Sequence, residues 1–176
     1  LLALSQALNP NSILELGSSK GDLIEAIAYD ETAGHTYLIL RTIGGDGAFA
    51  DSLGSWDAWV IKLDANFDTL WAKAYGGSGS DLPRDAIVED NGDLVIVGET
   101  YSDDGDVLIN RGNSDGWLLK LDSDGNVLMS ETYGGFNPDF FEAITPHKGD
   151  GYIVVGRSGS IEGDLPLRNL NLEPGI

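Results

Sequence analysis

The amino-acid sequence predicts an all-β fold built of tandem four-stranded antiparallel sheets. The first observation behind this prediction is self-similarity at a fixed interval: residues 71–77 return at residues 129–135, which is 58 positions later, and both copies end in Tyr-Gly-Gly. The second is that each unit holds four short runs of β-type residues separated by turn sequences. A tandem unit of this length with four strands is typical of a propeller blade, so we predict a β-propeller-like architecture.

The strands expected in each unit follow from short apolar runs and the turns between them. We predict strands at residues 23–29, 36–42, 56–63 and 69–75 in the first unit, at 84–89, 93–100, 115–121 and 126–133 in the second, and at 140–145 and 151–158 in the third. The Asn-Gly pair in 89–93 and the Asp-Gly pair in 122–126 are strong hairpin signals. The second strand of each unit is a continuous apolar run, which favours burial on both faces between neighbouring blades.

The number of predicted blades leaves the ring open. We treat residues 1–176 as one propeller segment, divided into the last strand of a preceding blade (11–16), blade 1 (17–76), blade 2 (77–134) and a partial blade 3 (135–176). About 2.75 blades cannot close a ring, and their exposed sheet edges invite association. We expect the rest of the ring to be missing from this chain or supplied by a partner; a non-propeller stack of the same units is the structural alternative. The chain does not begin with Met, so we expect a processed or cut piece of a longer protein.

Composition narrows the classes of partner and chemistry. Against 29 Asp and Glu stand only 10 Lys and Arg, for a formal net charge of −19. Such a surface repels phosphate backbones and anionic lipids, so we expect no nucleic acid partner and no membrane insertion. There is no cysteine, which excludes disulfides and cysteine-based metal sites. The 24 glycines fall between apolar runs, as turn residues do.

Three co-spaced stretches carry a resemblance to a known family. Residues 75–81, 91–100 and 114–126 resemble the SBBP-type (seven-bladed β-propeller) repeat of secreted and surface proteins of bacteria and archaea, and the resemblance extends from about residue 11 to about residue 169. The first unit departs from it, because residues 64–68 lack the turn glycine and residues 30–35 lengthen the first hairpin. The resemblance implies a propeller and a secreted or cell-surface location, but no particular reaction.

An acidic loop at residues 102–113 is the candidate metal site. Asp103, Asp104 and Asp106 are dense enough to ligate Ca²⁺, which takes six to eight oxygen ligands. Asp106 recurs as Asp164 at the 58-residue interval, which favours a structural turn instead, and we leave both interpretations open. Zinc is disfavoured because cysteine is absent and the two histidines lie in different predicted turns. Ca²⁺ is therefore the only cofactor that we expect, if there is one.

Recurrence separates packing residues from candidate ligand-binding residues. Trp59 and Trp117 are repeat-equivalent, and we predict that both are buried between adjacent blades. Trp71 aligns with Met129, which also indicates a packing position. Trp56 alone has no aromatic counterpart, so it is the aromatic residue that we expect to face a ligand.

Other motifs have structural explanations. The acids before the Ala-Ile pairs, Glu25, Asp85 and Glu142, recur and predict a repeated structural hydrogen bond. Residues 122–126 look like a Ca²⁺ loop, but the Asp-Gly hairpin explains them. Residues 17–21 match the Gly-x-Ser-x-Gly nucleophile elbow without the strand-to-helix context that this motif requires.

No unique catalytic group stands out from the repeats. We therefore predict a non-enzymatic secreted or cell-surface module that binds or scaffolds. Its expected partners are other blades or chain segments of a larger protein or assembly, and a protein or glycan ligand. The alternative is a carbohydrate-active enzyme on a propeller scaffold, a polysaccharide lyase or glycosidase. Glycoside cleavage would require two non-repeating acids about 5–10 Å apart.

Overall fold

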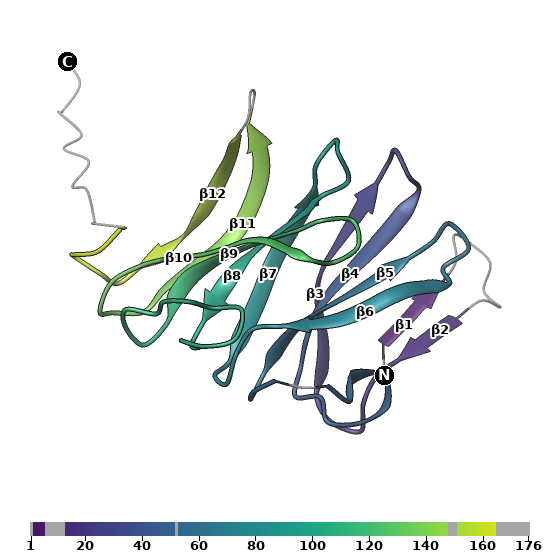
Figure 1. Ribbon diagram of the computed structural model, residues 1–176, viewed down its shortest axis with the longest axis horizontal. Helices are drawn as coiled ribbons and strands as arrows, with labels where there is room; N and C mark the ends of the chain where they lie inside the picture. The colour runs from purple at the N-terminus through teal and green to yellow at the C-terminus, as the bar shows by residue number, and fades with distance from the viewer. Residues whose placement is uncertain (1, 6–12, 52, 148–150, 165–176) are drawn as a thin grey trace, which may run out of the picture.

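The protein forms a row of antiparallel β-sheets. A computed structural model describes residues 2–5, 13–51, 53–147 and 151–164. Within these residues there are twelve strands and one short 3-10 helix, η1 (Gly47–Phe49). The strands make two four-stranded sheets and two two-stranded sheets, all antiparallel (Figure 1). The predicted all-β class with tandem four-stranded sheets is confirmed.

Each four-stranded sheet is a meander in chain order, and we call it a blade. Blade 1 consists of β3 (Asp22–Asp30), β4 (His35–Thr42), β5 (Asp57–Leu63) and β6 (Thr69–Tyr75). Blade 2 consists of β7 (Asp81–Val88), β8 (Leu94–Thr100), β9 (Asp115–Leu121) and β10 (Val127–Tyr133). The hairpin of β11 (Asp139–His147) and β12 (Gly151–Ser158) follows. All ten strands predicted in the three units are present, with ends that differ by at most three residues.

The sheets stand side by side, and the first strands of successive sheets pack on one another. β3 packs against β7, and β7 packs against β11 (Figure 1). Across the described residues the row does not close on itself, which fits an incomplete propeller.

A further two-stranded sheet lies at the amino-terminal end of the row. It pairs β1 (Leu2–Ser5) with β2 (Ile13–Leu16). The strand expected at residues 11–16 is thus present from Ile13 onward, while residues 11 and 12 lie outside the described residues. Its partner β1 was not predicted, because a short run of leucine and alanine carries no turn or alternation signal for a strand.

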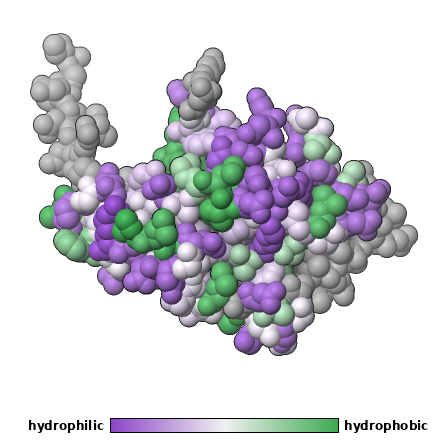
Figure 2. All heavy atoms as spheres, viewed as in Figure 1, coloured by the Kyte–Doolittle hydropathy of each residue, from purple (hydrophilic) through white to green (hydrophobic). Residues whose placement is uncertain are grey.

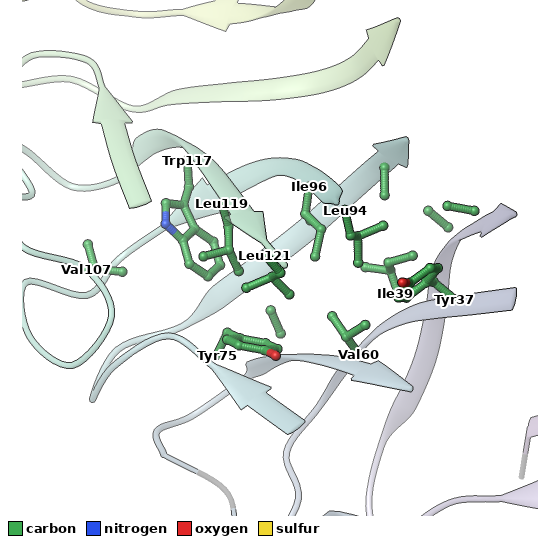
Figure 3. Close-up of a cluster of buried hydrophobic side chains, with 14 residues drawn as sticks. Tyr37, Ile39, Val60, Tyr75, Leu94, Ile96, Val107, Trp117, Leu119 and Leu121 are labelled. Carbon is green, nitrogen blue, oxygen red and sulfur yellow. The ribbon is translucent and has the colours of Figure 1, made fainter. Parts of the chain in front are cut away.

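The largest apolar cluster lies between blade 1 and blade 2. Side chains of blade 1 meet side chains of blade 2 there, and Figure 3 shows them pointing toward one another. From blade 1 these are Tyr37, Ile39, Val60 and Tyr75; from blade 2 they are Leu94, Ile96, Trp117, Leu119 and Leu121. Every residue of β8 and the apolar centre of β4 are buried, as the continuous apolar runs predict.

Burial of the two repeat-equivalent tryptophans is confirmed. Trp117 is 1% exposed and packs toward blade 1, whereas Trp59 is 3% exposed and packs with Phe49 on the opposite face of blade 1. Their register is the same, since Trp59 pairs with Leu40 and Trp117 with Gly98 in the equivalent neighbouring strands. The predicted alternation of the third strand is therefore correct.

A β-bulge in each of β3, β7 and β11 corrects one alignment. The extra residues are Glu25, Arg84 and Glu142. The prediction that Asp85 is equivalent to Glu25 and Glu142 is wrong by one position, because Asp85 follows the bulge. The acid nevertheless has a structural role, since Asp85 Oδ2 accepts a hydrogen bond from the Ile144 amide of the next sheet at 2.9 Å.

Both blades have an ion pair at the bulge, and the acidic and basic residues exchange positions between the blades. In blade 1 the bulge residue Glu25 pairs with Arg41 at 2.8 Å. In blade 2 the bulge residue Arg84 pairs with Glu99 at 2.9 Å, and Glu99 occupies the register position of Arg41. The two blades thus share the interaction although their side chains have opposite charge.

This exchange predicts the outcome of a charge reversal. Arg84→Glu should lower the free energy of unfolding by about 1 kcal/mol, because two acids then face each other at a partly buried site. Adding Glu99→Arg should recover most of that loss, since blade 1 holds the pair in this orientation. Urea denaturation measures both values, and a double variant no more stable than the single one would contradict the equivalence.

Candidate functional site

The blade-to-blade loops and the loops between second and third strands meet at one end of the sheets. We call this the loop end. The Tyr101 amide donates to Ser80 O at 2.8 Å, and the Ser55 amide donates to Gly79 O at 2.9 Å. Loops 43–56, 76–80 and 101–114 are thereby held together, as the strand directions predict.

An aspartate at the start of β3, β7 and β11 organises the loop end. Asp81 Oδ2 accepts hydrogen bonds from the Gly77 amide and the Ser102 hydroxyl, both at 2.8 Å, and its Oδ1 accepts one from Thr100 Oγ1 at 2.5 Å. Asp81 is fully buried. One carboxylate therefore ties a blade-to-blade loop to the loop that follows β8.

The same arrangement recurs in the other sheets. Asp139 accepts from the Gly135 amide at 2.9 Å and from Ser160 Oγ at 2.7 Å. Asp22 accepts from the Ser18 amide at 2.7 Å and from the Thr42 hydroxyl. Sequence reasoning missed these residues, although Asp81 and Asp139 lie 58 positions apart and the signal was present.

A second buried aspartate starts the third strand of each blade. Asp57 accepts hydrogen bonds from the Leu53 amide at 2.7 Å and the Gly54 amide at 2.8 Å. Its equivalent Asp115 accepts one from the Arg111 amide at 2.9 Å. Each blade junction therefore holds two buried acids, one from each neighbouring sheet.

The pKa values of these acids reflect their surroundings. Burial raises the pKa of Asp81 despite its three hydrogen bonds, and the charge of Asp57 adds to the rise. Burial also raises the pKa of Asp115, and the charge of Asp139 adds to it. For Asp139 burial acts in the same direction, but hydrogen bonds from Ser158, Ser160 and Gly135 outweigh it and its pKa is lowered.

Two of the three predicted Ca²⁺ ligands accept hydrogen bonds from backbone amides. Asp104 Oδ1 accepts from the Ser78 amide at 2.6 Å, and Asp106 Oδ2 accepts from the Gly76 amide at 3.1 Å. Both carboxylates therefore cap the neighbouring blade-to-blade loop, whereas Asp103 is exposed. Among the described residues, no three acidic or histidine side chains gather closely enough to hold a metal ion.

Trp56 is half-buried at the loop end. Its ring lies over Gly21, where an added Cβ would come within 3.0 Å of it, and the Arg41 guanidinium lies 5.4 Å from the ring centre. Its carbonyl accepts the Asp81 amide at 2.6 Å. Trp56 also forms a β-bridge with Ser80, so it lies beside the blade-to-blade loop 76–80.

The opposite end of the sheets contains a contact that sequence reasoning did not find. Four side chains of blade 1 donate hydrogen bonds to backbone carbonyls of the β9–β10 turn of blade 2, and we call them the hairpin clamp. Lys62 Nζ donates to Ser123 O at 2.7 Å, Trp71 Nε1 to Ser123 O at 3.2 Å, Lys73 Nζ to Asp124 O at 2.7 Å and Tyr75 Oη to Gly125 O at 2.7 Å.

The seated turn is the one that the Asp-Gly pair predicts. Asp122 Oδ1 accepts the amides of Asp124 at 2.9 Å and Asn126 at 2.8 Å, so its carboxylate serves the turn. Gly125 has a positive φ of 75°, which glycine adopts readily. In blade 1, Phe67 takes that place with φ 66°, which explains how the turn forms there without glycine.

One packing prediction is corrected at the clamp. Trp71 is only partly buried and packs edge-on against Tyr37, with ring centres 6.1 Å apart. Its repeat equivalent Met129 is 37% exposed. The position is therefore a site of blade-to-blade contact, and it is buried only where a turn is seated on it.

Tyr75 and its equivalent Tyr133 provide a matched test of the clamp. Tyr75→Phe should lower the free energy of unfolding by about 1 kcal/mol, because the buried Gly125 carbonyl loses its shorter hydrogen bond and keeps only the one from Lys73 Nζ at 3.2 Å. Tyr133→Phe should change it by less than about 0.5 kcal/mol, because among the described residues no turn is seated over Tyr133. Chemical denaturation measures both, and equal losses would contradict the clamp.

A groove lies at the same end between blade 2 and the β11–β12 hairpin. It has a volume of about 580 Å³ and is lined by residues that include Glu89, Lys120, His147 and Tyr152. Lys120 Nζ lies 2.6 Å from a Glu89 carboxylate oxygen and 3.3 Å from one of Asp93. The Tyr152 hydroxyl donates to Glu89.

The visible surface and the comparisons with known proteins complete the description. Figure 2 shows a largely hydrophilic face on which apolar side chains form separate small groups. None of the described residues belongs to a helix long and apolar enough to cross a membrane. The sequence matches no model of a known protein family and no curated protein.

Proposed function

We propose that the chain is a non-enzymatic segment of tandem propeller blades that acts as a binding and scaffolding module. The observation that carries this proposal is the recurrence of hydrogen-bonded acids at the loop end. Asp22, Asp81 and Asp139 take the same position in successive sheets, and each accepts backbone amide and hydroxyl donors. A catalytic acid would normally be a single residue, whereas a repeated carboxylate with repeated donors supports the loops.

The location and partners are proposed on the resemblance and the charge. A secreted or cell-surface placement is supported by the likeness of residues 75–81, 91–100 and 114–126 to the SBBP-type repeat. The net charge of −19 suits an exposed, soluble surface. The proposed partners are further blades or chain segments of a larger protein or assembly, with a protein or glycan ligand at the loop end beside Trp56.

The alternative function, a carbohydrate-active enzyme, would require a close pair of acids. Asp57 and Asp81 approach each other at the first junction, but both are fully buried and a second pair repeats them. We expect no release of reducing ends or unsaturated uronates when the purified chain is incubated with a panel of neutral and acidic polysaccharides. Turnover that Asp81→Asn abolishes, in a variant that remains folded, would replace the binding module by an enzyme.

Binding at the loop end can be tested separately from catalysis. A glycan array and calorimetry with the intact chain identify a ligand, and Trp56→Ala should weaken its binding at least about tenfold if the ring contacts it. Met129→Ala, at the opposite end of the sheets, is the matched control and should leave the affinity unchanged. An equal affinity in both variants would remove Trp56 from the proposed site.

Ca²⁺ at Asp103, Asp104 and Asp106 stays a prediction. A bound ion would raise the melting temperature by mass action, and Asp104→Asn with Asp106→Asn would remove that gain. The same double variant should also lower the melting temperature in EDTA, because both carboxylates cap backbone amides. Equal melting temperatures of the unaltered chain in millimolar Ca²⁺ and in EDTA would contradict a calcium site.

A further inference from the structure

The two blade junctions differ in what occupies the hairpin clamp. Blade 1 presents Lys62, Trp71, Lys73 and Tyr75 to the β9–β10 turn of blade 2. By strand register the equivalent residues of blade 2 are Lys120, Met129, Glu131 and Tyr133. Among the described residues only β11 and β12 follow blade 2, so no third-and-fourth-strand hairpin lies on these positions. We call them the second clamp.

Side chains of blade 2 and of β12 are more exposed than their equivalents in blade 1 and in β8. Met129 is 37% exposed, whereas Trp71 is half-buried under the seated turn. Among the described residues, strand β12 pairs only with β11, whereas its equivalents β4 and β8 are paired on both edges. Ile153 and Val155 are 48% and 55% exposed, and the equivalent Val95 and Val97 are fully buried. β12 is thus as apolar as a central strand but lies at an edge.

We propose that the second clamp and the free edge of β12 form a docking site for a β-hairpin of the repeat's own third-and-fourth-strand type. The inference deepens the proposed scaffolding function and rests on it. The first junction identifies the occupant, because it shows the same surface with that hairpin in place. The first strand of the hairpin would pair with β12, and its turn carbonyls would face Lys120.

Lys120 is held near the position that its role requires. Its equivalent Lys62 donates to a turn carbonyl at 2.7 Å. Lys120 instead pairs with Glu89 and Asp93 at the wall of the 580 Å³ groove. A turn entering the groove would offer carbonyl oxygens to this ammonium, since lysine has three donors and can keep one carboxylate partner.

Two residues of the second clamp differ from their equivalents in the hairpin clamp, and they determine which turn sequence the second clamp would bind. Met129 replaces Trp71 and removes a donor, and Glu131 replaces Lys73 and reverses a charge. An acidic turn such as residues 122–126 would meet the Glu131 carboxylate, and like charges repel. The preferred hairpin therefore has a turn that carries an amide or basic side chain next to Glu131.

A fusion tests the proposal in the full chain. Residues 115–134, with Asp124 of the copy replaced by Asn to avoid the Glu131 carboxylate, are copied in place of residues 173–176, so that the copy of Asp115 stands 58 positions after Asp115. The fusion should raise the melting temperature by at least about 5 °C. Met129→Trp with Glu131→Lys, which grafts the clamp of blade 1 onto blade 2, should raise it further in the fusion but not in the unfused chain.

Tyr133→Phe distinguishes binding of the hairpin at the second clamp from a general gain in stability. Tyr133→Phe should be close to neutral in the unfused chain and should lower the melting temperature of the fusion by about 3 °C or more. A fusion in which the copied Trp117 is replaced by Asp is the control and should show no gain. The copied segment is also added in trans as a peptide, where the clamp graft should tighten its binding at least about tenfold.

Two outcomes would overturn the proposal. One is a fusion with an unchanged melting temperature, together with a peptide that binds the chain with the same affinity whether or not the clamp graft is present. The other is a melting temperature of the unfused chain that rises with protein concentration while β12 becomes protected from exchange, which would assign the edge to a second copy of the chain. Neither outcome affects the assay for polysaccharide cleavage, so failure of the docking site is distinguishable from failure of the proposed function.

Discussion

Trp117→Ala should lower the free energy of unfolding by about 3–5 kcal/mol, which is the typical cost of truncating a large buried side chain. Trp117 lies in the cluster between blade 1 and blade 2, is 1% exposed and donates from Nε1 to Ser130 Oγ at 2.9 Å. Its loss leaves a cavity between two sheets that touch mainly through this cluster. Equilibrium urea denaturation measures the change.

Met129→Ala is the matched control for that experiment. Met129 is also a large apolar residue of blade 2, but it is 37% exposed. Its truncation should lower the free energy of unfolding by less than about 1 kcal/mol. A loss below about 1 kcal/mol for Trp117→Ala, or equal losses for the two variants, would show that the blades do not meet across this cluster.

Asp81→Ala should lower the free energy of unfolding by about 2–4 kcal/mol. The substitution leaves the Gly77 amide and the hydroxyls of Thr100 and Ser102 without their acceptor, and each unsatisfied buried donor costs about 1–3 kcal/mol. Asp103→Ala, which alters an exposed acid, is the control and should stay within about 0.5 kcal/mol of the unaltered chain. Similar losses in both variants would argue against a structural role for the buried acid.

The raised pKa of Asp81 also predicts a pH dependence of stability, which Asp81→Asn tests. Burial raises the pKa of Asp81 in the folded protein above its value of 3.8 in the unfolded chain. The folded state therefore binds this proton more tightly, and the stability linked to it is greatest below pH 3.8 and declines as the pH rises toward the folded-state pKa. Asp81→Asn should remove this decline, so the difference in stability between the two proteins should change with pH across that window. A difference independent of pH would contradict the raised pKa.

The sequence predicted those parts of the fold that depend on local pattern. The strands of both blades, the turn at residues 122–126 and the burial of Trp59 and Trp117 follow from alternation, turn residues and repetition, which are all local signals. The alignment of Asp85 failed because the Ala-Ile pair used to align it lies one residue later relative to the bulge in blade 2 than in the other two sheets. The Ala-Ile pair is therefore not sufficient to align the residues within these strands.

The candidate site was predicted less completely, for a physical reason. Side-chain hydrogen bonds between sheets depend on which loops meet, and this is a property of the packed blades. Asp104 and Asp106 look like free carboxylates in the sequence, yet each accepts a backbone amide of the preceding loop. Lys62 and Lys73 look like surface lysines, yet they hold a turn that lies more than 50 residues away. Recurrence of Asp57 as Asp115 and of Asp81 as Asp139 at the 58-residue interval was a signal of these buried acids that sequence reasoning did not use.

Amide hydrogen exchange measured strand by strand tests most directly the claim that each blade is completed and covered by the next. Strands β4 and β8 are paired on both edges and buried on both faces, so their amides should exchange only through global unfolding. Strand β12 has the same apolar sequence character, but among the described residues only β11 pairs with it, so its amides should exchange at least about a hundredfold faster. Protection of β12 equal to that of β8, in a chain shown to be monomeric, would contradict the vacant seat and with it the account of how these blades are joined.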